Sequence, residues 1–254
     1  MKFFLLFIAL LFILPILVHA QIIKISISQI LGIEIPNLDY DKIVQNGELF
    51  NISFDIYNSG SVGYAARVRL DILKNNDSIF VGWSEELPLW PNSYGHYELF
   101  WYPSNSTEKF TARIRIYYAN EIKELKPINF EVRTYSSPSS SIKITQFKTY
   151  EDKLKIGLVS DKDLKNIIII PSDYPLGWIF EQVKLDSLSA NKEKIIDIQY
   201  VPSIWQPIQV NINVVAENGK YFSSESFTME RETGIWSYIS YVMESIRVML
   251  KIQS

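Results

Sequence analysis

The residues that could carry out chemistry are few in this 254-residue chain, which holds no cysteine and two histidines. Thiolate chemistry is therefore excluded, and so are zinc sites built from thiolates or from several histidines. His19 lies in a leader-like segment, so a Ser-His-acid triad would have to use His96. No G-x-S-x-G nucleophile elbow accompanies this histidine. We therefore expect that the protein is not an enzyme and has no catalytic residues, cofactor or metal.

Carboxylates are the remaining catalytic groups, because a pair of acids is sufficient for most glycoside hydrolysis. Glu85 and Glu86, close to Trp83 and Trp90, form the best such neighbourhood in the chain. Adjacent residues on a strand point to opposite faces, so these two carboxylates are not expected to converge. Hydrolysis therefore ranks below binding as a hypothesis.

Calcium needs only oxygen ligands, and such residues alternate at two places in the chain. Neither place has the glycine and distal glutamate of an EF-hand loop. We interpret both as solvated turns; the residues are Asn37, Asp39 and Asp41 at the first place and Asp161 and Asp163 at the second.

Aromatic residues are the stronger candidates for recognition. Planar rings offer a large rigid area that can stack on a sugar or anchor a protein partner. At least half of the aromatic set between residues 83 and 102 should belong to the core, Tyr97 and Trp101 among them. We predict ligand or partner contacts at Trp83, Trp90 and Tyr94, and above all at Trp90 because it lies in a loop.

The N-terminal segment indicates export. Lys2 precedes an apolar stretch over residues 3–18, and Val18-His19-Ala20 resembles a cleavage site before Gln21. Residues 1–20 are thus predicted to be a signal peptide, with an uncleaved anchor as the alternative. Either way we expect an extracytoplasmic protein, secreted or at the cell surface. The net charge of −3 gives no general attraction to nucleic acid.

Alternating apolar and polar residues fill most of the remaining chain. Over 50–57, for example, phenylalanines and isoleucines occupy every second position, as a half-buried strand requires. Such patterns extend over 21–135 and over 142–230. The stretch 136–141, five serines and one proline, is predicted to be a solvated linker between them. The fold class expected is all-β, with two immunoglobulin-like antiparallel β-sandwiches in tandem.

Turn signals and one unusual run refine this prediction. Lys74-Asn75-Asn76-Asp77 and Glu217-Asn218-Gly219-Lys220 are each predicted to connect two strands, since Asn and Gly tolerate positive φ. Asn58-Ser59-Gly60-Ser61 is predicted to form a further turn. Residues 167–170 are instead four consecutive isoleucines, an uninterrupted apolar run.

The first strand region resembles a known family. The segment from Leu49 to Ile72, with Tyr57-Asn58-Ser59-Gly60 between its two strands, resembles CARDB-type cell-adhesion-related domains. The loop Leu89-Trp90-Pro91-Asn92-Ser93-Tyr94-Gly95 and the strand that ends in Trp101-Tyr102-Pro103 fit the same layout. The resemblance covers roughly residues 45–133. It implies an immunoglobulin-like module of exported surface proteins and carries over no catalytic residues.

The second strand region resembles a different family. Pro175-Leu176-Gly177-Trp178, followed by an alternating strand and Val201-Pro202, is similar to the NPCBM-associated sandwich that is linked to α-galactosidases. That family is not itself catalytic. The resemblance implies association with carbohydrate-active or surface proteins.

The last residues change to a helical period over 234–252. Glu244 and Arg247 make a membrane span costly, so we predict an amphipathic helix that lies on a membrane surface or binds an envelope protein. Packing against the protein's own sandwich is the alternative. The contact face would comprise Ile235, Trp236, Ile239, Val242, Met243, Ile246, Met249 and Leu250.

Three Asn-x-Ser/Thr sequons, at Asn51, Asn76 and Asn105, are candidate glycosylation sites. Together these features predict a non-catalytic exported cell-surface protein with a structural, adhesive or envelope-assembly role. The alternative is a carbohydrate-binding accessory module that uses the aromatic residues of 83–102.

Overall fold

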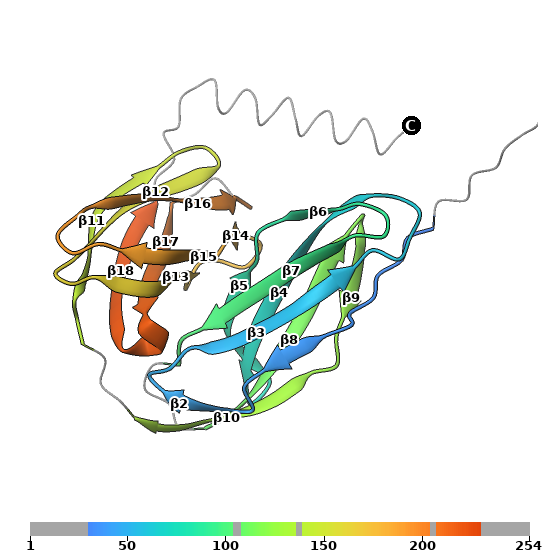
Figure 1. Cartoon of the computed structure of the whole chain (residues 1–254), viewed down its shortest axis with the longest axis horizontal. Coiled ribbons are helices and arrows are strands. Elements are labelled where there is room, and N and C mark those ends of the chain that lie inside the picture. Colours follow the sequence, from blue (N-terminus) through green and yellow to red (C-terminus); the bar gives the residue numbers. More distant parts are fainter. Residues whose placement is uncertain (1–29, 104–107, 136–138, 204–206, 230–254) are drawn as a thin grey trace, which may run out of the picture. The chain divides into compact units, whose positions relative to one another are not determined.

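The structure is a computed structural model that describes residues 30–103, 108–135, 139–203 and 207–229. From Leu31 onward the described residues belong to one compact unit. They form β-strands and one short 3₁₀ turn (Figure 1), which confirms the prediction of an all-β protein. The segments predicted as a signal peptide (1–20) and as a C-terminal helix (234–252) lie outside the described residues. Within the described part of the chain, no helix is long and apolar enough to cross a membrane.

Strands β1 to β10 form the first sandwich, in which two sheets enclose one core. One sheet has the order β1-β3-β7 and comprises β1 (Leu38–Tyr40), β3 (Phe50–Tyr57) and β7 (Tyr94–Trp101). The other has the order β2-β10-β8-β4-β5, with β6 paired to β4 and β9 to β8. Its strands are β2 (Ile43–Asn46), β4 (Tyr64–Lys74), β5 (Asp77–Trp83), β6 (Leu87–Leu89), β8 (Lys109–Tyr118), β9 (Glu121–Glu124) and β10 (Ile128–Tyr135).

The core of the first sandwich follows from the alternation in the sequence. Every second residue of β3 is buried, and the ring of Phe50 stacks on that of Phe130 with centroids 3.9 Å apart. The predicted turn between β4 and β5 is confirmed. Asn75 and Asn76 both have positive φ, 52° and 71°, as a two-residue type I′ hairpin requires.

Strands β11 to β18 form the second sandwich around a core of its own. One sheet, of order β11-β12-β16-β14, comprises β11 (Ile142–Thr149), β12 (Lys153–Ser160), β16 (Lys194–Val201) and β14 (Ile179–Phe180). The other, of order β15-β13-β17-β18, comprises β15 (Val183–Leu188), β13 (Leu164–Ser172), β17 (Ile208–Ala216) and β18 (Tyr221–Met229).

Strand β13 explains the uninterrupted isoleucine run. Ile167 and Ile169 face the core of the second sandwich, whereas Ile168 and Ile170 pack into the cluster that forms the core of the first. A strand that is buried on both faces needs no polar alternation. The two sandwiches therefore share apolar packing along β13.

The hairpin predicted at Asn218-Gly219 is confirmed between β17 and β18, where the 3₁₀ turn η1 (Glu217–Gly219) connects the strands. Gly219 has a φ of 99°, and a Cβ atom there would lie 1.6 Å from the carbonyl oxygen of Gly47. Glycine is thus required twice, for its backbone conformation and for this close approach between the sandwiches. In the predicted linker, Ser139 and Ser140 are exposed, and Ser139 forms a parallel bridge with Tyr221.

Candidate functional site

The most exposed aromatic residues of the first sandwich flank one turn, in which the Ser93 N–H donates to the Trp90 carbonyl oxygen at 3.0 Å. Trp90, in the loop after β6, is 70% exposed, and Tyr94, the first residue of β7, is 65% exposed. Tyr94 pairs directly across the sheet with Tyr57 at the end of β3, and their ring centroids are 4.6 Å apart. A Cβ atom on Gly63 would lie only 3.1 Å from the Trp90 ring, so this ring rests on the Gly63 backbone. We call Tyr57, Trp90 and Tyr94 the aromatic platform.

Asn58, which is completely buried, holds the platform loop in place. Its Oδ1 accepts the Gly60 N–H at 2.9 Å, while its Nδ2 donates to the carbonyl oxygens of Leu89 (3.0 Å) and Val62 (2.9 Å). Its main-chain N–H donates to the Ser93 oxygen at 3.0 Å. In the sequence, Asn58 belongs to a predicted turn and to the CARDB-like segment Tyr57-Asn58-Ser59-Gly60, but neither indicates these hydrogen bonds. One side chain thus connects the turn after β3 to the loop before β7.

Polar groups continue from the platform along the outer face of the β1-β3-β7 sheet. The Tyr57 hydroxyl donates to Asn92 Oδ1 at 3.1 Å. The next cross-strand pair is Asp55 and His96, with 2.8 Å between Oδ1 and Nδ1. Asn37 Nδ2 donates to the other oxygen of Asp55 at 3.4 Å. The hydrogen bond from His96 lowers the pKa of Asp55, against a smaller opposing effect of burial.

Of the three predicted contact residues, Trp90 and Tyr94 are exposed on either side of one turn, whereas Trp83 is buried. Trp83 is 6% exposed, with the Arg69 guanidinium 5.4 Å from its ring centroid and the Tyr117 ring 5.2 Å away. Tyr97 and Trp101 are buried, as expected of core residues. Sequence reasoning missed Tyr57, which its cross-strand register makes the third ring of the platform.

The sequons differ in exposure. Asn76 is exposed in the turn between β4 and β5. Asn51 is half-buried on β3, and its buried Oδ1 has no hydrogen-bond partner in the part of the chain that the structure describes. Asn105 lies outside the described residues. The described part of the sequence therefore offers Asn76 as its most accessible acceptor.

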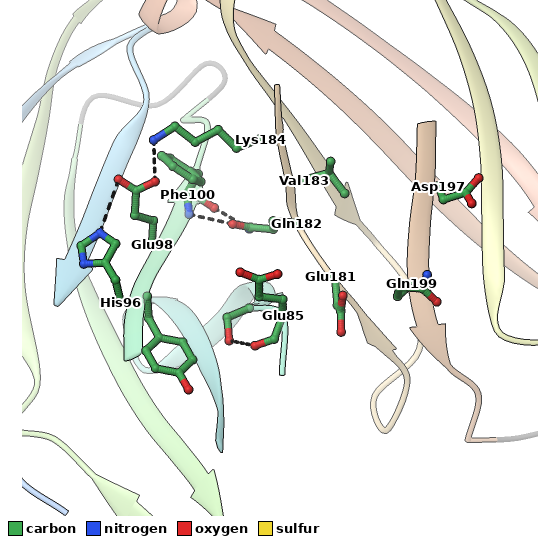
Figure 2. A pocket seen from close by; sticks show the side chains of 12 residues that line it. Glu85, His96, Glu98, Phe100, Glu181, Gln182, Val183, Lys184, Asp197 and Gln199 are labelled. Carbon is green, nitrogen blue, oxygen red and sulfur yellow. Dashed lines mark hydrogen bonds and ion pairs between the residues drawn. The ribbon is translucent and has the colours of Figure 1, made fainter. Parts of the chain in front are cut away.

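A second feature is a cavity of about 450 Å³ between β7 and the strands around β15 (Figure 2). We call it the interstrand cavity. Figure 2 shows His96, Glu98 and Phe100 on one side and Gln182 and Val183 on the other. Its remaining lining residues are Ser84, Glu85, Tyr97, Glu181, Lys184, Asp197 and Gln199.

Cations neutralise most carboxylates of the interstrand cavity. Glu98 pairs with Lys184 at 2.6 Å, and Asp197 pairs with Lys153 at 2.9 Å. Glu181 lies 2.9 Å from the Arg67 guanidinium; burial raises its pKa, and the charge of Arg67 opposes that effect. No ion pair to Glu85 is found within the described residues.

The carboxylates that the sequence suggested for catalysis or calcium binding have different surroundings in the structure. Glu85 lines the interstrand cavity, whereas the Glu86 carboxylate lies 3.8 Å from Arg67. In the candidate calcium stretches, Asn37 is bound to Asp55, and Asp163 Oδ1 accepts the main-chain N–H of Ala190 at 2.8 Å. Over the described ranges, no group of three or more His, Cys, Asp or Glu side chains could hold a metal ion.

A charged cluster stabilises the other face of the first sandwich. Asp71 on β4 is completely buried, and its carboxylate accepts hydrogen bonds from Arg69 (2.6 Å) and Arg115 (2.7 Å), with Arg113 at 3.8 Å. Burial of the Arg115 guanidinium is the largest single effect on its pKa and lowers it, but the hydrogen bond to Asp71 and the negative charge of Asp71, with smaller contributions from Tyr117 and Glu124, together raise the pKa. The cluster is therefore a structural ion network centred on one carboxylate.

Comparison with known proteins assigns no family. No family model matches the chain, and no curated protein matches it. Among solved structures, a CARDB domain from Pyrococcus furiosus in complex with di-metal ions is 17% identical, with 42% of this chain and 96% of that chain covered and a TM-score of 0.31. A Pseudomonas fluorescens alkylpurine DNA glycosylase bound to DNA with an abasic-site analog is 14% identical, at a TM-score of 0.32.

That match covers 41% of this chain and 31% of the glycosylase, so this chain spans about a third of its length. Red sea bream transglutaminase is 6% identical, with 80% of this chain and 32% of that chain covered and a TM-score of 0.31. Scores of this size assign neither a family nor an activity. For residues 45–133, the comparisons support a CARDB-like all-β domain and not membership of the CARDB family. The resemblance to the NPCBM-associated family stays a prediction.

Proposed function

We propose that this protein is a non-catalytic, exported surface protein with a structural or adhesive role, built from two immunoglobulin-like sandwiches in tandem. The observation that carries the proposal is the aromatic platform. Trp90 and Tyr94 are 70% and 65% exposed, and the buried Asn58 fixes the loop that presents them. Large, rigid, exposed rings are what binding hot spots are made of, because little side-chain entropy is lost on contact.

The packing between the sandwiches supports a spacer role. Ile168 and Ile170 of the second sandwich contribute to the core of the first, and the rings of Tyr102 and Phe222 stack with centroids 4.5 Å apart. The Tyr174 hydroxyl also donates to the Val81 carbonyl oxygen at 2.9 Å. Such contacts restrict rotation between the modules, so the platform would keep a fixed orientation relative to the second sandwich.

Attachment is the second part of the proposal. The predicted amphipathic helix of 234–252 would hold the chain to a membrane surface or an envelope protein, while the platform engages its partner. This part rests on the sequence pattern alone. Membrane partition of the mature chain with and without residues 234–254 tests it. Sedimentation with vesicles by the full-length chain only is expected, and equal solubility of both forms would contradict lipid attachment.

The platform is tested by binding of the purified mature chain to envelope fractions of the producing cell. Trp90→Ala combined with Tyr94→Ala is expected to weaken binding by about tenfold or more, as loss of a hot spot does. Leu176→Ala is the matched control, because Leu176 is an apolar residue of the second sandwich and is 78% exposed. Unchanged binding by the double variant would refute the platform as the contact surface.

A carbohydrate ligand is the second candidate function, favoured by the polar groups beside the rings. Asp55 and His96 follow Tyr57 and Tyr94 on the same sheet face, and Asn92 of the turn accepts the Tyr57 hydroxyl. Sugars are held by stacking together with hydrogen bonds to hydroxyl groups. An array of neutral oligosaccharides tests this with the wild type, Trp90→Ala and Trp90→Phe. Binding retained by phenylalanine and lost with alanine is expected. No bound glycan would leave a protein partner as the ligand of the platform.

A further inference from the structure

Strand β7 is the last strand of its sheet, and one of its edges pairs with no other strand among the described residues. It pairs with β3 from Tyr94 to Trp101 without a register shift, and its other edge borders the interstrand cavity. At Phe100, the side-chain amide of Gln182 makes the two hydrogen bonds that the main chain of a neighbouring strand would make (Figure 2). The Phe100 N–H donates to Gln182 Oε1 at 2.8 Å, and Gln182 Nε2 donates to the Phe100 carbonyl oxygen at 2.7 Å.

At Glu98 and His96 the same edge has no partner strand among the described residues. Main-chain groups alternate in direction along a strand, so the N–H and C=O of Glu98 and His96 face the same side as those of Phe100. Within the described residues, no main-chain hydrogen bond reaches either residue from that side. Four main-chain groups therefore face the cavity, directly beside the place where Gln182 already completes the pairing.

The cavity has room and charge for an added strand. A strand that pairs with β7 would lie about 4.8 Å from it. The cavity on this side of β7 has a volume of about 450 Å³. In an added strand, the residue between those opposite His96 and Glu98 would lie opposite Tyr97. Its side chain would point to the same face of the sheet as that of Tyr97, because side chains alternate along a strand. Glu85 lines the cavity with Tyr97 and forms no ion pair within the described residues. A basic side chain at that position of the added strand could form an ion pair with Glu85.

We propose that the β7 edge at His96 and Glu98 binds an extended peptide segment of a partner protein by β-strand addition, with a lysine or arginine of the segment beside Glu85. Exposed strand edges are templates for this kind of pairing. The site is separate from the aromatic platform, and it would give a surface protein a second contact with a protein chain. Specificity comes from the central basic residue, and most of the affinity comes from main-chain hydrogen bonds.

The test uses the full mature chain and the blocked peptide acetyl-Ser-Thr-Lys-Thr-Ser-amide. In this peptide the two threonines would pair with His96 and Glu98, and the lysine would lie between them. Amide resonances of His96 and Glu98 are followed by nuclear magnetic resonance during titration. We expect both to shift and their hydrogen exchange to slow. N-methylation of the two threonines should weaken binding by at least about tenfold, since it removes two main-chain donors.

Matched variants separate charge from backbone pairing. Glu85→Gln should weaken the lysine peptide severalfold and leave a peptide with central glutamine unaffected, whereas Trp90→Ala should change neither. Equal binding of the N-methylated peptide, or no shift of His96 and Glu98 at millimolar peptide, would overturn the proposal. Concentration-dependent shifts of the same amides without peptide would overturn it as well, because the edge would then pair with a second copy of this chain.

Discussion

Replacing Asn58 with alanine should destabilise the protein and loosen the aromatic platform together. The substitution removes three hydrogen bonds and leaves the Gly60 N–H and the carbonyl oxygens of Leu89 and Val62 without their partner. Each such bond contributes about 0.5–1.5 kcal/mol net, and the groups left behind are part-buried or buried. We therefore expect the free energy of unfolding to fall by roughly 3 kcal/mol.

Urea unfolding of the full mature chain measures this loss, and the binding assay for the platform measures its consequence. Asn129→Ala is the control, because Asn129 is exposed and accepts one hydrogen bond, from Thr111. It should cost no more than about 0.5 kcal/mol. A loss below about 1 kcal/mol for Asn58→Ala, with binding unchanged, would refute the view that this side chain fixes the loop.

Three further predictions concern other contacts. Asp71→Asn should lower the free energy of unfolding by about 2–4 kcal/mol, because it leaves the clustered arginines without their anion. A loss below about 1 kcal/mol in urea unfolding would contradict the ion network. Gly82→Ala should lower the free energy of unfolding by about 1–3 kcal/mol, because the new Cβ would lie 2.6 Å from Nε2 of Gln182. It should also shift the side-chain amide resonances of Gln182, and unchanged resonances would contradict this contact. The Asp55 carboxyl should titrate below its ordinary value of 3.8, so its contact with His96 adds stability above that pH and loses it as the pH falls through the lowered pKa. Carbon-13 titration should show the midpoint rise in His96→Gln, and an unmoved midpoint would disprove the coupling.

The strands could be predicted because burial on one face imposes alternation. Phe50, Ile52 and their neighbours are buried where the pattern placed them, and Asn75-Asn76 form the expected turn. The isoleucine run of β13 was visible in the sequence, but what covers its second face was not. That face packs into the core of the other sandwich, a tertiary contact that no local pattern contains.

The candidate site could be predicted only in part. Trp83 and Trp90 are seven positions apart and both were predicted as contact residues, but Arg69 and Tyr117 from adjacent strands cover Trp83 while Trp90 is exposed. Gln182 pairs with the main chain of Phe100, 82 positions away, so nothing near it in sequence indicates its role. Exposure and long-range pairing depend on the assembled sheets, which is why these features required the structure.

The most direct test of the central claim is oxidative footprinting of Trp90 in the purified mature chain and on intact producing cells. Trp83, which is 6% exposed, serves as the internal reference because it should react slowly in both settings. If the platform is the contact surface, Trp90 should be oxidised readily in solution and be protected several-fold on the cell. Equal oxidation of Trp90 in both settings would contradict the account.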